Sequence, residues 1–296
     1  MLNLIKSDLY RITRPRGLRG SFWQYGLALV VACGFVAGLV VFANSPLFAD
    51  MTGGVVTIGE VLTQRSITVY FADMMNGLVP LCIAFMAVEH ALAELKSGYA
   101  KSVLSARLGR LSYIAGKIVF AGVLAALVLL FATVISLVCL PIMTGGHVAF
   151  STSEGPLEII GWFVGFWLNT WALSALSLVL VYATRVSPVS YIGAFCFTAS
   201  VIPQLLMGLA YSSGGLLRFL EPLAPVFETL AVWIPSSALN NLSGGGQLFL
   251  NNSLEIWGPA SRAFTIDPGV QTLLTGVIWI VIASVVVLAI ARKRDI

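Results

Sequence analysis

Four ionisable side chains lie in or beside the long apolar stretches of this chain and are its first candidates for chemistry: Asp73, Glu89, His90 and Lys117. A metalloprotease helix carries HExxH, which places two histidines one turn apart beside a glutamate that acts as general base. Glu89-His90 does not have that spacing. Because ionisable groups are tolerated at the ends of spans, we expect both to reach water at one end of a span. An intramembrane catalytic role is the alternative.

The cysteines and histidines do not form a metal-binding pattern. Four cysteines lie inside apolar runs: Cys33, Cys82, Cys139 and Cys196. None belongs to a CxxC pair or to a Cys/His cluster, so we expect reduced, packed side chains. His90 and His147 supply too few nitrogen ligands for a zinc site of the usual kind. We therefore predict no bound metal.

A nucleotide-binding loop is not recognisable either. Such a loop has the pattern GxxxxGK[ST], whose backbone cradles phosphate between a strand and a helix. In the nearest stretch, "GRLSYIAGKI", Gly109 lies too far from Gly116-Lys117, and Ile118 replaces the required hydroxyl residue. The sequence therefore predicts no nucleotide site, no cofactor bound by this chain and no catalytic residue of its own.

Composition places the chain in a membrane. Hydrophobic residues make up 58% of it and charged residues 10%, with a mean hydropathy of +0.94, far from the balance of a soluble domain. A helix needs roughly 20 apolar residues to cross the hydrocarbon core. Six runs are expected to do so: 21–44, 67–92, 111–143, 159–184, 189–217 and 270–291. The sequence thus predicts an all-α integral membrane protein with one transmembrane domain over 1–296, its second span bent at Pro80.

The Lys and Arg residues are divided unevenly between the two sides of this layout. Fourteen of the 17 fall on the side of the two termini, and only Arg65, Arg218 and Arg262 fall on the other. By the positive-inside rule we expect both termini in the cytoplasm and a multi-pass protein of the plasma membrane. The net charge of +4 then reflects topology, and no nucleic-acid partner is expected.

Two segments outside the spans have apolar character. In the leader, residues 1–20, Leu2, Ile5, Leu9 and Ile12 share one helical arc opposite Asp8 and Arg11, which predicts an amphipathic helix lying flat in the headgroup region. A frayed basic tail is the alternative. In the external loop, residues 212–269, the stretch "FLEPLAPVFETLAVWIP" is too broken by prolines to span, which favours a re-entrant or interfacial element over a plain solvated loop.

Basic residues concentrate between the second and third spans, over residues 94–110. At 100° per residue, Tyr99, Ala100, Val103 and Leu104 lie on one arc, and Lys101 lies on the other. We predict a short amphipathic helix on the cytoplasmic face, set off by Gly98. Such an element either docks into a soluble partner or rests on anionic lipid, and the pattern alone leaves both open.

This loop resembles that of the permease subunits of bacterial ABC-2 type ATP-binding cassette exporters. The shared pattern is E-x-x-S-G-x-x-K-x-x-L-S-x-x-x-x-R-x-x-Y-x-x-G-K, and the layout of a basic leader and six spans is similar too. Its matching residues are Glu94, Ser97, Gly98, Lys101, Leu104, Ser105, Arg110, Tyr113, Gly116 and Lys117. Many members have a proline where this chain has Ala106.

The resemblance implies a permease without chemistry of its own. A separate cytoplasmic ABC ATPase subunit would bind ATP and Mg, and a second permease subunit, identical or different, would complete the exporter of an amphipathic antimicrobial peptide, drug or lipid. The expected ATPase-coupling residues are Glu94, Gly98, Tyr99, Lys101, Val103, Leu104, Arg107 and Arg110. The expected substrate path, along the second and fifth spans, is lined by Met74, Met75, Asn76, Phe85, Phe195, Gln204 and Met207, for each of which core packing is the alternative role.

Two other classes compete with this interpretation. The first is a membrane transporter or channel that works without an ATPase. The second is an intramembrane transferase or protease, which the shortage of paired polar groups in the spans disfavours.

Overall fold

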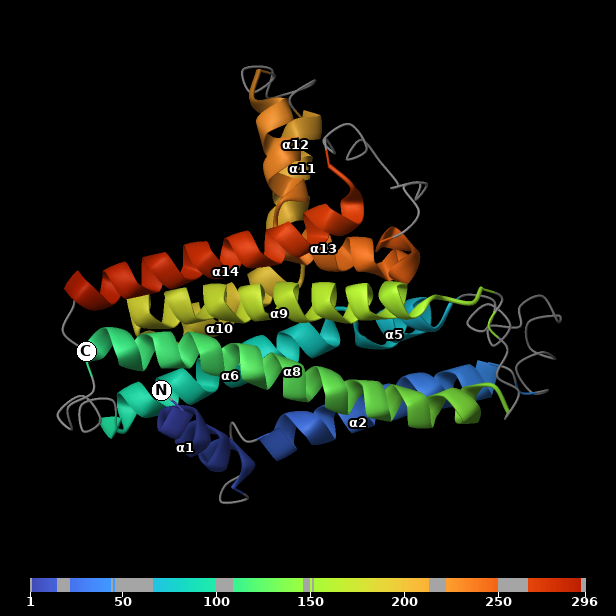
Figure 1. Cartoon of the computed structure of the whole chain (residues 1–296), viewed down its shortest axis with the longest axis horizontal. Helices are drawn as coiled ribbons and strands as arrows, with labels where there is room; N and C mark the ends of the chain where they lie inside the picture. Colours follow the sequence, from blue (N-terminus) through green and yellow to red (C-terminus); the bar gives the residue numbers. More distant parts are fainter. Residues whose placement is uncertain are drawn as a thin grey trace.

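The chain is described here by a computed structural model, which covers residues 2–14, 22–43, 45, 66–99, 109–145, 150, 152–212, 222–249 and 266–293. Over these ranges the regular structure is helical, without a strand. The long helices run side by side, and the two chain ends lie at the same end of the bundle (Figure 1). Helices suit such apolar segments because every backbone group within them is paired internally.

Five helices are long and apolar enough to cross a membrane. They are α2 (Phe22–Ala43), α6 (Leu78–Lys96), α8 (Arg110–Met143), α9 (Pro156–Thr184) and α14 (Pro268–Lys293). A bent pair, α10 (Ser187–Thr198) and α11 (Val201–Ser212), makes a sixth if it is counted as one span. The prediction of an all-helical chain is confirmed for the described residues, which hold five or six segments long and apolar enough to span a membrane.

The second predicted span breaks at a different place from the one expected. Its first part, α5 (Ile67–Met75), ends at Asn76, and α6 begins after Gly77, whose φ of 78° suits glycine. Pro80 falls in the first turn of α6, where a missing N–H has no partner to lose. The prediction of a bend at Pro80 is therefore wrong, because the left-handed Gly77 makes the break.

The fifth predicted span is not one straight helix. Between α10 and α11 the chain turns by 63°, and Ser200 adopts a left-handed φ of 57°. Pro203 lies in the first turn of α11, where it does not interrupt the helix. The expected span 189–217 is thus two shorter helices over its described part.

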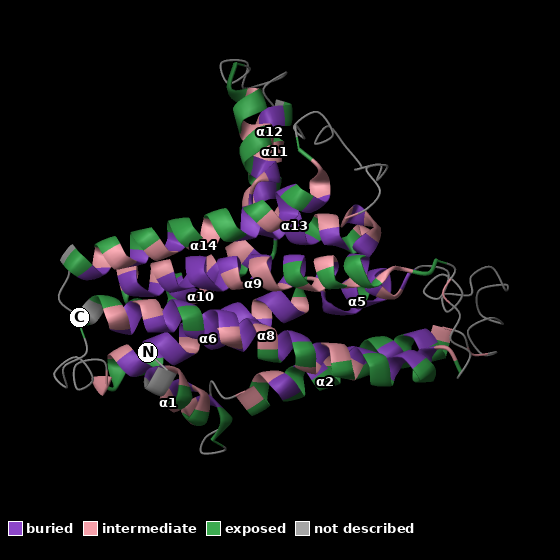
Figure 2. Cartoon of the chain, viewed as in Figure 1, coloured by how far each residue is buried: buried purple, intermediate pink, exposed green. Residues whose placement is uncertain are grey.

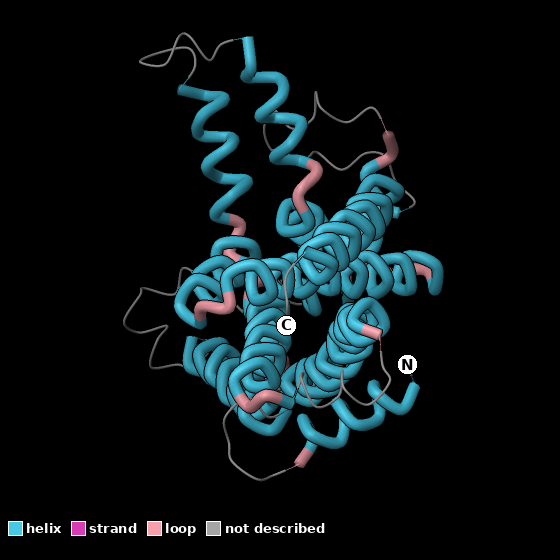
Figure 3. The backbone as a smooth tube through the Cα atoms, turned by 90° about the vertical axis from the view of Figure 1, so that its left-hand side faces the viewer, coloured by secondary structure: helices cyan, strands magenta, loops and turns pink. Residues whose placement is uncertain are grey.

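The chain between α11 and α14 has two parts. Helix α12 (Ala224–Val232) packs against α11, and the pair projects away from the long bundle (Figures 1 and 3). The following short helices return along the bundle: α13 (Pro235–Asn241), η2 (Leu242–Gly244) and η3 (Gly246–Phe249). Trp162 of α9 fixes this return by donating from Nε1 to the Leu242 carbonyl at 2.9 Å. Re-entry of this segment into the membrane stays a prediction.

The N-terminal segment forms α1 (Leu2–Thr13), as expected of a helix, but Asp8 on its predicted polar face is buried. Leu4, Asp8 and Ile12 are all buried, and the exposed fraction of Asp8 is 0%. Gly116 of α8 allows this close packing, since a Cβ there would lie 2.5 Å from Leu4. The expectation that Asp8 lies on the side opposite the buried arc is wrong, because Asp8 pairs with Lys117 and His90 inside the bundle. Figure 2 shows how far the burial extends along α6, α8 and α9.

Candidate functional site: a buried ionic cluster

An ammonium group lies between two buried carboxylates where α1, α6 and α8 meet. Lys117 Nζ is 2.7 Å from Asp8 Oδ2 and 2.6 Å from Glu94 Oε2. The exposed fractions of these side chains are 2% for the lysine and 0% for both acids. Three helices thus each contribute one charge to a single desolvated contact.

Two further groups complete the environment of Glu94. Arg11 donates from Nη1 to Oε1 at 2.5 Å, and the Tyr113 hydroxyl donates to Oε2 at 2.6 Å. Counting Asp8 and Lys117, the cluster then holds two carboxylates and two cations. This balance matters because a buried charge without its partner is strongly destabilising.

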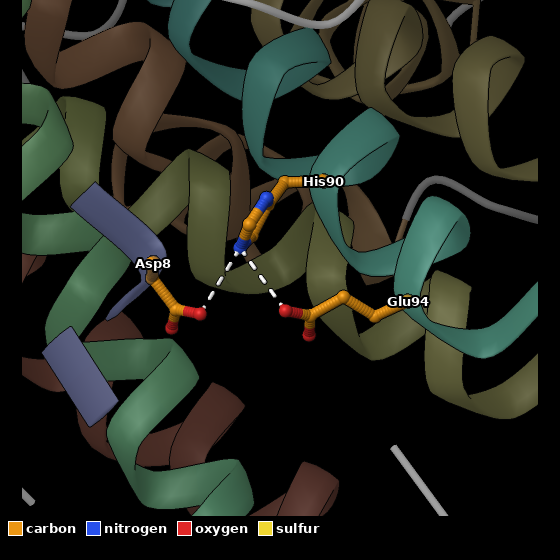
Figure 4. A group of neighbouring side chains, drawn as sticks. All are labelled: Asp8, His90 and Glu94. Atoms are coloured by element: carbon orange, nitrogen blue, oxygen red, sulfur yellow. Dashed lines mark ion pairs between the residues drawn. The ribbon is translucent and has the colours of Figure 1, made fainter. Parts of the chain in front are cut away.

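His90 lies inside the same cluster. Its Nε2 is 3.5 Å from Asp8 Oδ1 and 3.4 Å from Glu94 Oε1, and both carboxylates point toward the ring (Figure 4). The expectation that His90 reaches water is wrong, since its side chain is only 8% exposed. Its neighbour Glu89 is half-buried and accepts a hydrogen bond from the Tyr25 hydroxyl at 2.9 Å.

Helical spacing explains why these side chains converge. His90 and Glu94 are four residues apart on α6, as are Tyr113 and Lys117 on α8, so each pair shares one face. On α1, Leu4, Asp8 and Ile12 form the face that packs inward. The sequence offered these spacings, but it gave no sign that the three faces meet.

Asp8 is ionised within this environment. Burial by itself would raise the pKa of Asp8, but hydrogen bonding with His90 and the charge of Lys117 outweigh it and hold the pKa below its ordinary value. Asp8 therefore carries its negative charge at neutral pH.

The same residues resemble a metal site in part. One ligand atom each from Asp8, His90 and Glu94 lies within 4.8 Å of the others, and carboxylate with imidazole is a donor set that binds divalent ions. However, Lys117 already places its ammonium within hydrogen-bond distance of both carboxylates. A metal would have to displace this cation, so the arrangement fits an ionic lock better than a metal centre.

Residues of α1 in and beside the cluster also contact the start of the basic loop. The Arg11 guanidinium lies 4.2 Å from the centre of the Tyr99 ring, and Ser7 Oγ is 3.3 Å from the Tyr99 hydroxyl. Glu94 and Tyr99 lie at the start of the 94–110 segment, while Tyr113 and Lys117 follow it. Helix α1 thus contacts the flanks on both sides of the loop.

The predicted ATPase-coupling residues fall into two groups. Of those described, Glu94 points into the cluster, Gly98 has a φ of 70°, and Tyr99 is half-buried beside α1. Four others lie outside the described part of the chain: Lys101, Val103, Leu104 and Arg107. Arg110 is the first residue of α8, but its side chain is outside the described part. Docking of this element to an ATPase stays a prediction.

The predicted path residues do not share one environment. Met74 and Met75 are buried in the core at the end of α5, next to the half-buried Asn76. Phe85 on α6 packs edge-on against Tyr191 of α10, with ring centres 5.5 Å apart.

On the bent pair the predicted path residues are more open. Phe195 of α10 is 48% exposed, Gln204 of α11 is exposed, and Met207 is half-buried. A path between the two sets stays a prediction, and packing describes the first set better.

Sequence reasoning missed Asp8, His90 and Lys117 as one site. The available signal was the cost of charge in an apolar chain: two acids and one lysine at helical spacings near the same end of three predicted helices must find partners.

A comparison of the chain with known protein families and with curated proteins gives no match to either. Its function therefore has to be argued from the ionic cluster and the loop that the cluster flanks.

Proposed function

We propose that this chain is the permease subunit of an ABC-2 type exporter, driven by a separate cytoplasmic ABC ATPase. ATP and Mg would be bound by that ATPase, and a second permease subunit would complete the assembly. The substrate class is an amphipathic molecule: an antimicrobial peptide, a drug or a lipid.

One observation carries the proposal. Four of the ten residues through which the loop resembles these permeases take part in the cluster or its packing: Glu94 and Lys117 pair directly, Tyr113 donates to Glu94, and Gly116 admits α1. The resemblance is therefore not confined to the surface of the loop.

The cluster suits the transmission of force from a soluble motor. A push on the loop would act on α6 and α8 together, because buried ion pairs connect their ends to each other and to α1. Displacement of the loop would then move two spans as one unit instead of being absorbed by a flexible turn.

Co-purification tests the proposal. The neighbouring reading frames are searched for a P-loop ATPase, and the chain is expressed with it, extracted in mild detergent and isolated through a tag on the permease alone. We expect the ATPase to co-purify and ATP hydrolysis to require it, while the permease alone hydrolyses none. A complex that never forms, with ATP turnover by the isolated permease, would refute the division of labour.

A transporter without an ATPase is the second candidate, and the bend between α10 and α11 favours it. Secondary transporters place their sites at broken helices near the middle of the membrane. Uptake of amphipathic dyes by proteoliposomes containing only this chain, unaffected by ATP, would support this candidate over the first.

A further inference from the structure

Unpartnered polar atoms gather where α9, α13 and α14 pack together. Seven buried side-chain oxygens or nitrogens in the described part of the chain have no hydrogen-bond partner within it. Six of them come from these three helices, and one of the six is the Tyr182 hydroxyl near the C-terminal end of α9. The other five form what we call the polar junction: Asn169 Oδ1, Thr170 Oγ1, Ser236 Oγ, Gln271 Oε1 and Thr275 Oγ1. Their side chains are at most 2% exposed.

The hydrogen bonds of Asn169 fix the orientation of its side-chain amide. Its Nδ2 donates to two carbonyl oxygens, that of Gly165 at 2.8 Å and that of Thr272 at 2.9 Å. Two acceptors fix which end of the carboxamide is the nitrogen. Oδ1 is therefore aimed the other way, buried and without a donor.

Helix α14 adds two oxygens beside this contact. Gln271 and Thr275 lie one turn apart on α14, on either side of Thr272, whose carbonyl accepts from Asn169. The backbones of α9 and α14 approach closely here, since a Cβ on Gly276 would lie 2.7 Å from the Leu168 Cβ. The two helices are therefore in close backbone contact beside the polar junction.

Helix α13 covers the remaining side. It packs against both α9 and α14 and brings Ser236, which is 1% exposed. Trp279 of α14 holds the chain just before α13 through a hydrogen bond from Nε1 to the Trp233 carbonyl at 2.5 Å. Helices α9, α13 and α14 thus contact one another pairwise around the polar junction (Figure 1).

Folded proteins leave few buried polar atoms without partners, and those left together are explained by a bound water or ion. We propose that the polar junction is a binding site for ordered water molecules. Its oxygens are two amide carbonyls, which only accept hydrogen bonds, and three hydroxyls, which donate or accept. A water molecule offers both roles, and it brings no charge into a set of neutral groups, whereas a cation would enter without a counter-charge.

Radiolytic labelling tests the site on the whole chain in lipid nanodiscs. Ionising X-rays convert bound water into hydroxyl radicals that oxidise adjacent side chains, which mass spectrometry locates. We expect oxidation near Asn169 and Thr272 despite their burial, well above that of the α8 core around Leu124 and Ala125, which is equally buried. Labelling no higher than in that α8 segment would overturn the proposal.

Two variants separate bound water from general looseness of the fold. Thr275→Val keeps the shape of the side chain and removes its oxygen, so labelling at the polar junction should fall toward the level of the α8 segment. The matched control is Ser174→Ala on α9, whose hydroxyl already donates to the Thr170 carbonyl at 3.0 Å and should leave labelling unchanged. Equal labelling in Thr275→Val and in the unmodified chain would contradict the site.

A comparison of sodium with choline distinguishes a bound cation from bound water. The thermal unfolding midpoint is measured in sodium chloride and in choline chloride at equal ionic strength. We expect no difference, and a midpoint raised by sodium but not in Thr275→Val would replace water by a cation. None of these measurements involves an ATPase or a cargo, so their failure leaves the proposed function untouched.

Discussion

The ionic cluster of α1, α6 and α8 and the polar junction of α9, α13 and α14 are both buried, yet their hydrogen bonding differs. In the cluster, both Glu94 oxygens are bonded and Lys117 contacts two carboxylates. In the polar junction, five neutral oxygens have no partner among the described residues. Charge explains the difference, because an unpaired buried ion costs far more than an unpaired amide or hydroxyl. Charges in contact with opposite charges make a lock, although Asp8 Oδ1 itself has no hydrogen-bond partner, whereas unpaired neutral groups leave room for a ligand.

The largest effect is expected from breaking the lock. Lys117→Met removes the cation between two buried carboxylates, and removal of one partner of a buried pair costs about 3–5 kcal/mol. We expect a strongly lowered unfolding midpoint, followed by tryptophan fluorescence in detergent. Lys96→Met, which removes an exposed lysine from the same end of the bundle, is the control and should change the midpoint little.

A second substitution distinguishes lost charge balance from lost packing. In Asp8→Asn with Lys117→Met, the remaining Glu94 still pairs with Arg11, so part of the lost stability should return. A double variant less stable than Lys117→Met alone would show that the cluster is not balanced in this way.

A smaller effect is expected when the contacts between α1 and the residues beside the loop are removed. Arg11→Ala removes the charged hydrogen bond to Glu94 and the contact with the Tyr99 ring. A hydrogen bond to a charged group contributes about 1.5–3 kcal/mol to stability. We expect trypsin to cut the segment between α6 and α8 faster while the spans stay intact. Arg14→Ala, on an exposed residue outside the cluster, is the control. Equal cutting of the two variants would show that α1 does not restrain the loop.

In the polar junction the expected effect is smaller still, and its sign is informative. If water bonds to Thr275, then Thr275→Val should cost about 1 kcal/mol of unfolding free energy. If the hydroxyl is buried without any partner, the same change should be neutral or stabilising. Chemical unfolding in detergent, compared with Ser174→Ala, measures this difference between a hydrated and a dry junction.

The smallest effect concerns pH. The pKa of Asp8 is lowered in the folded chain, so its contribution to stability is present above the ordinary pKa of an aspartate and is lost as pH falls through the lowered value. Between pH 5 and 8, Asp8 should therefore make no difference to the slope of the unfolding midpoint against pH. A slope in that range that disappears in Asp8→Asn would show that the lock opens at mild acidity.

The helical character and most helix positions follow from the sequence alone. The run predicted over 21–44 appears as α2, Phe22–Ala43, and that over 111–143 appears as α8, Arg110–Met143. Such runs are decided locally, because a continuous apolar stretch must both hide its side chains from water and pair its own backbone. Breaks were harder to place, since Pro80 is a strong local signal and Gly77 is a weak one, yet the backbone turns at Gly77.

The two buried polar sites were decided by the tertiary structure. Asp8 and Lys117 are 109 residues apart, and Asn169 reaches a carbonyl 103 residues away. From the sequence alone, Asp8 is expected on the solvent-exposed face of an amphipathic helix, and Asn169 is a single polar residue in an apolar span. Helical periodicity fixes which residues share a face but not which other face they meet. Packing decides which faces meet, because the free-energy cost of burying a charge or an amide depends on the groups that surround it.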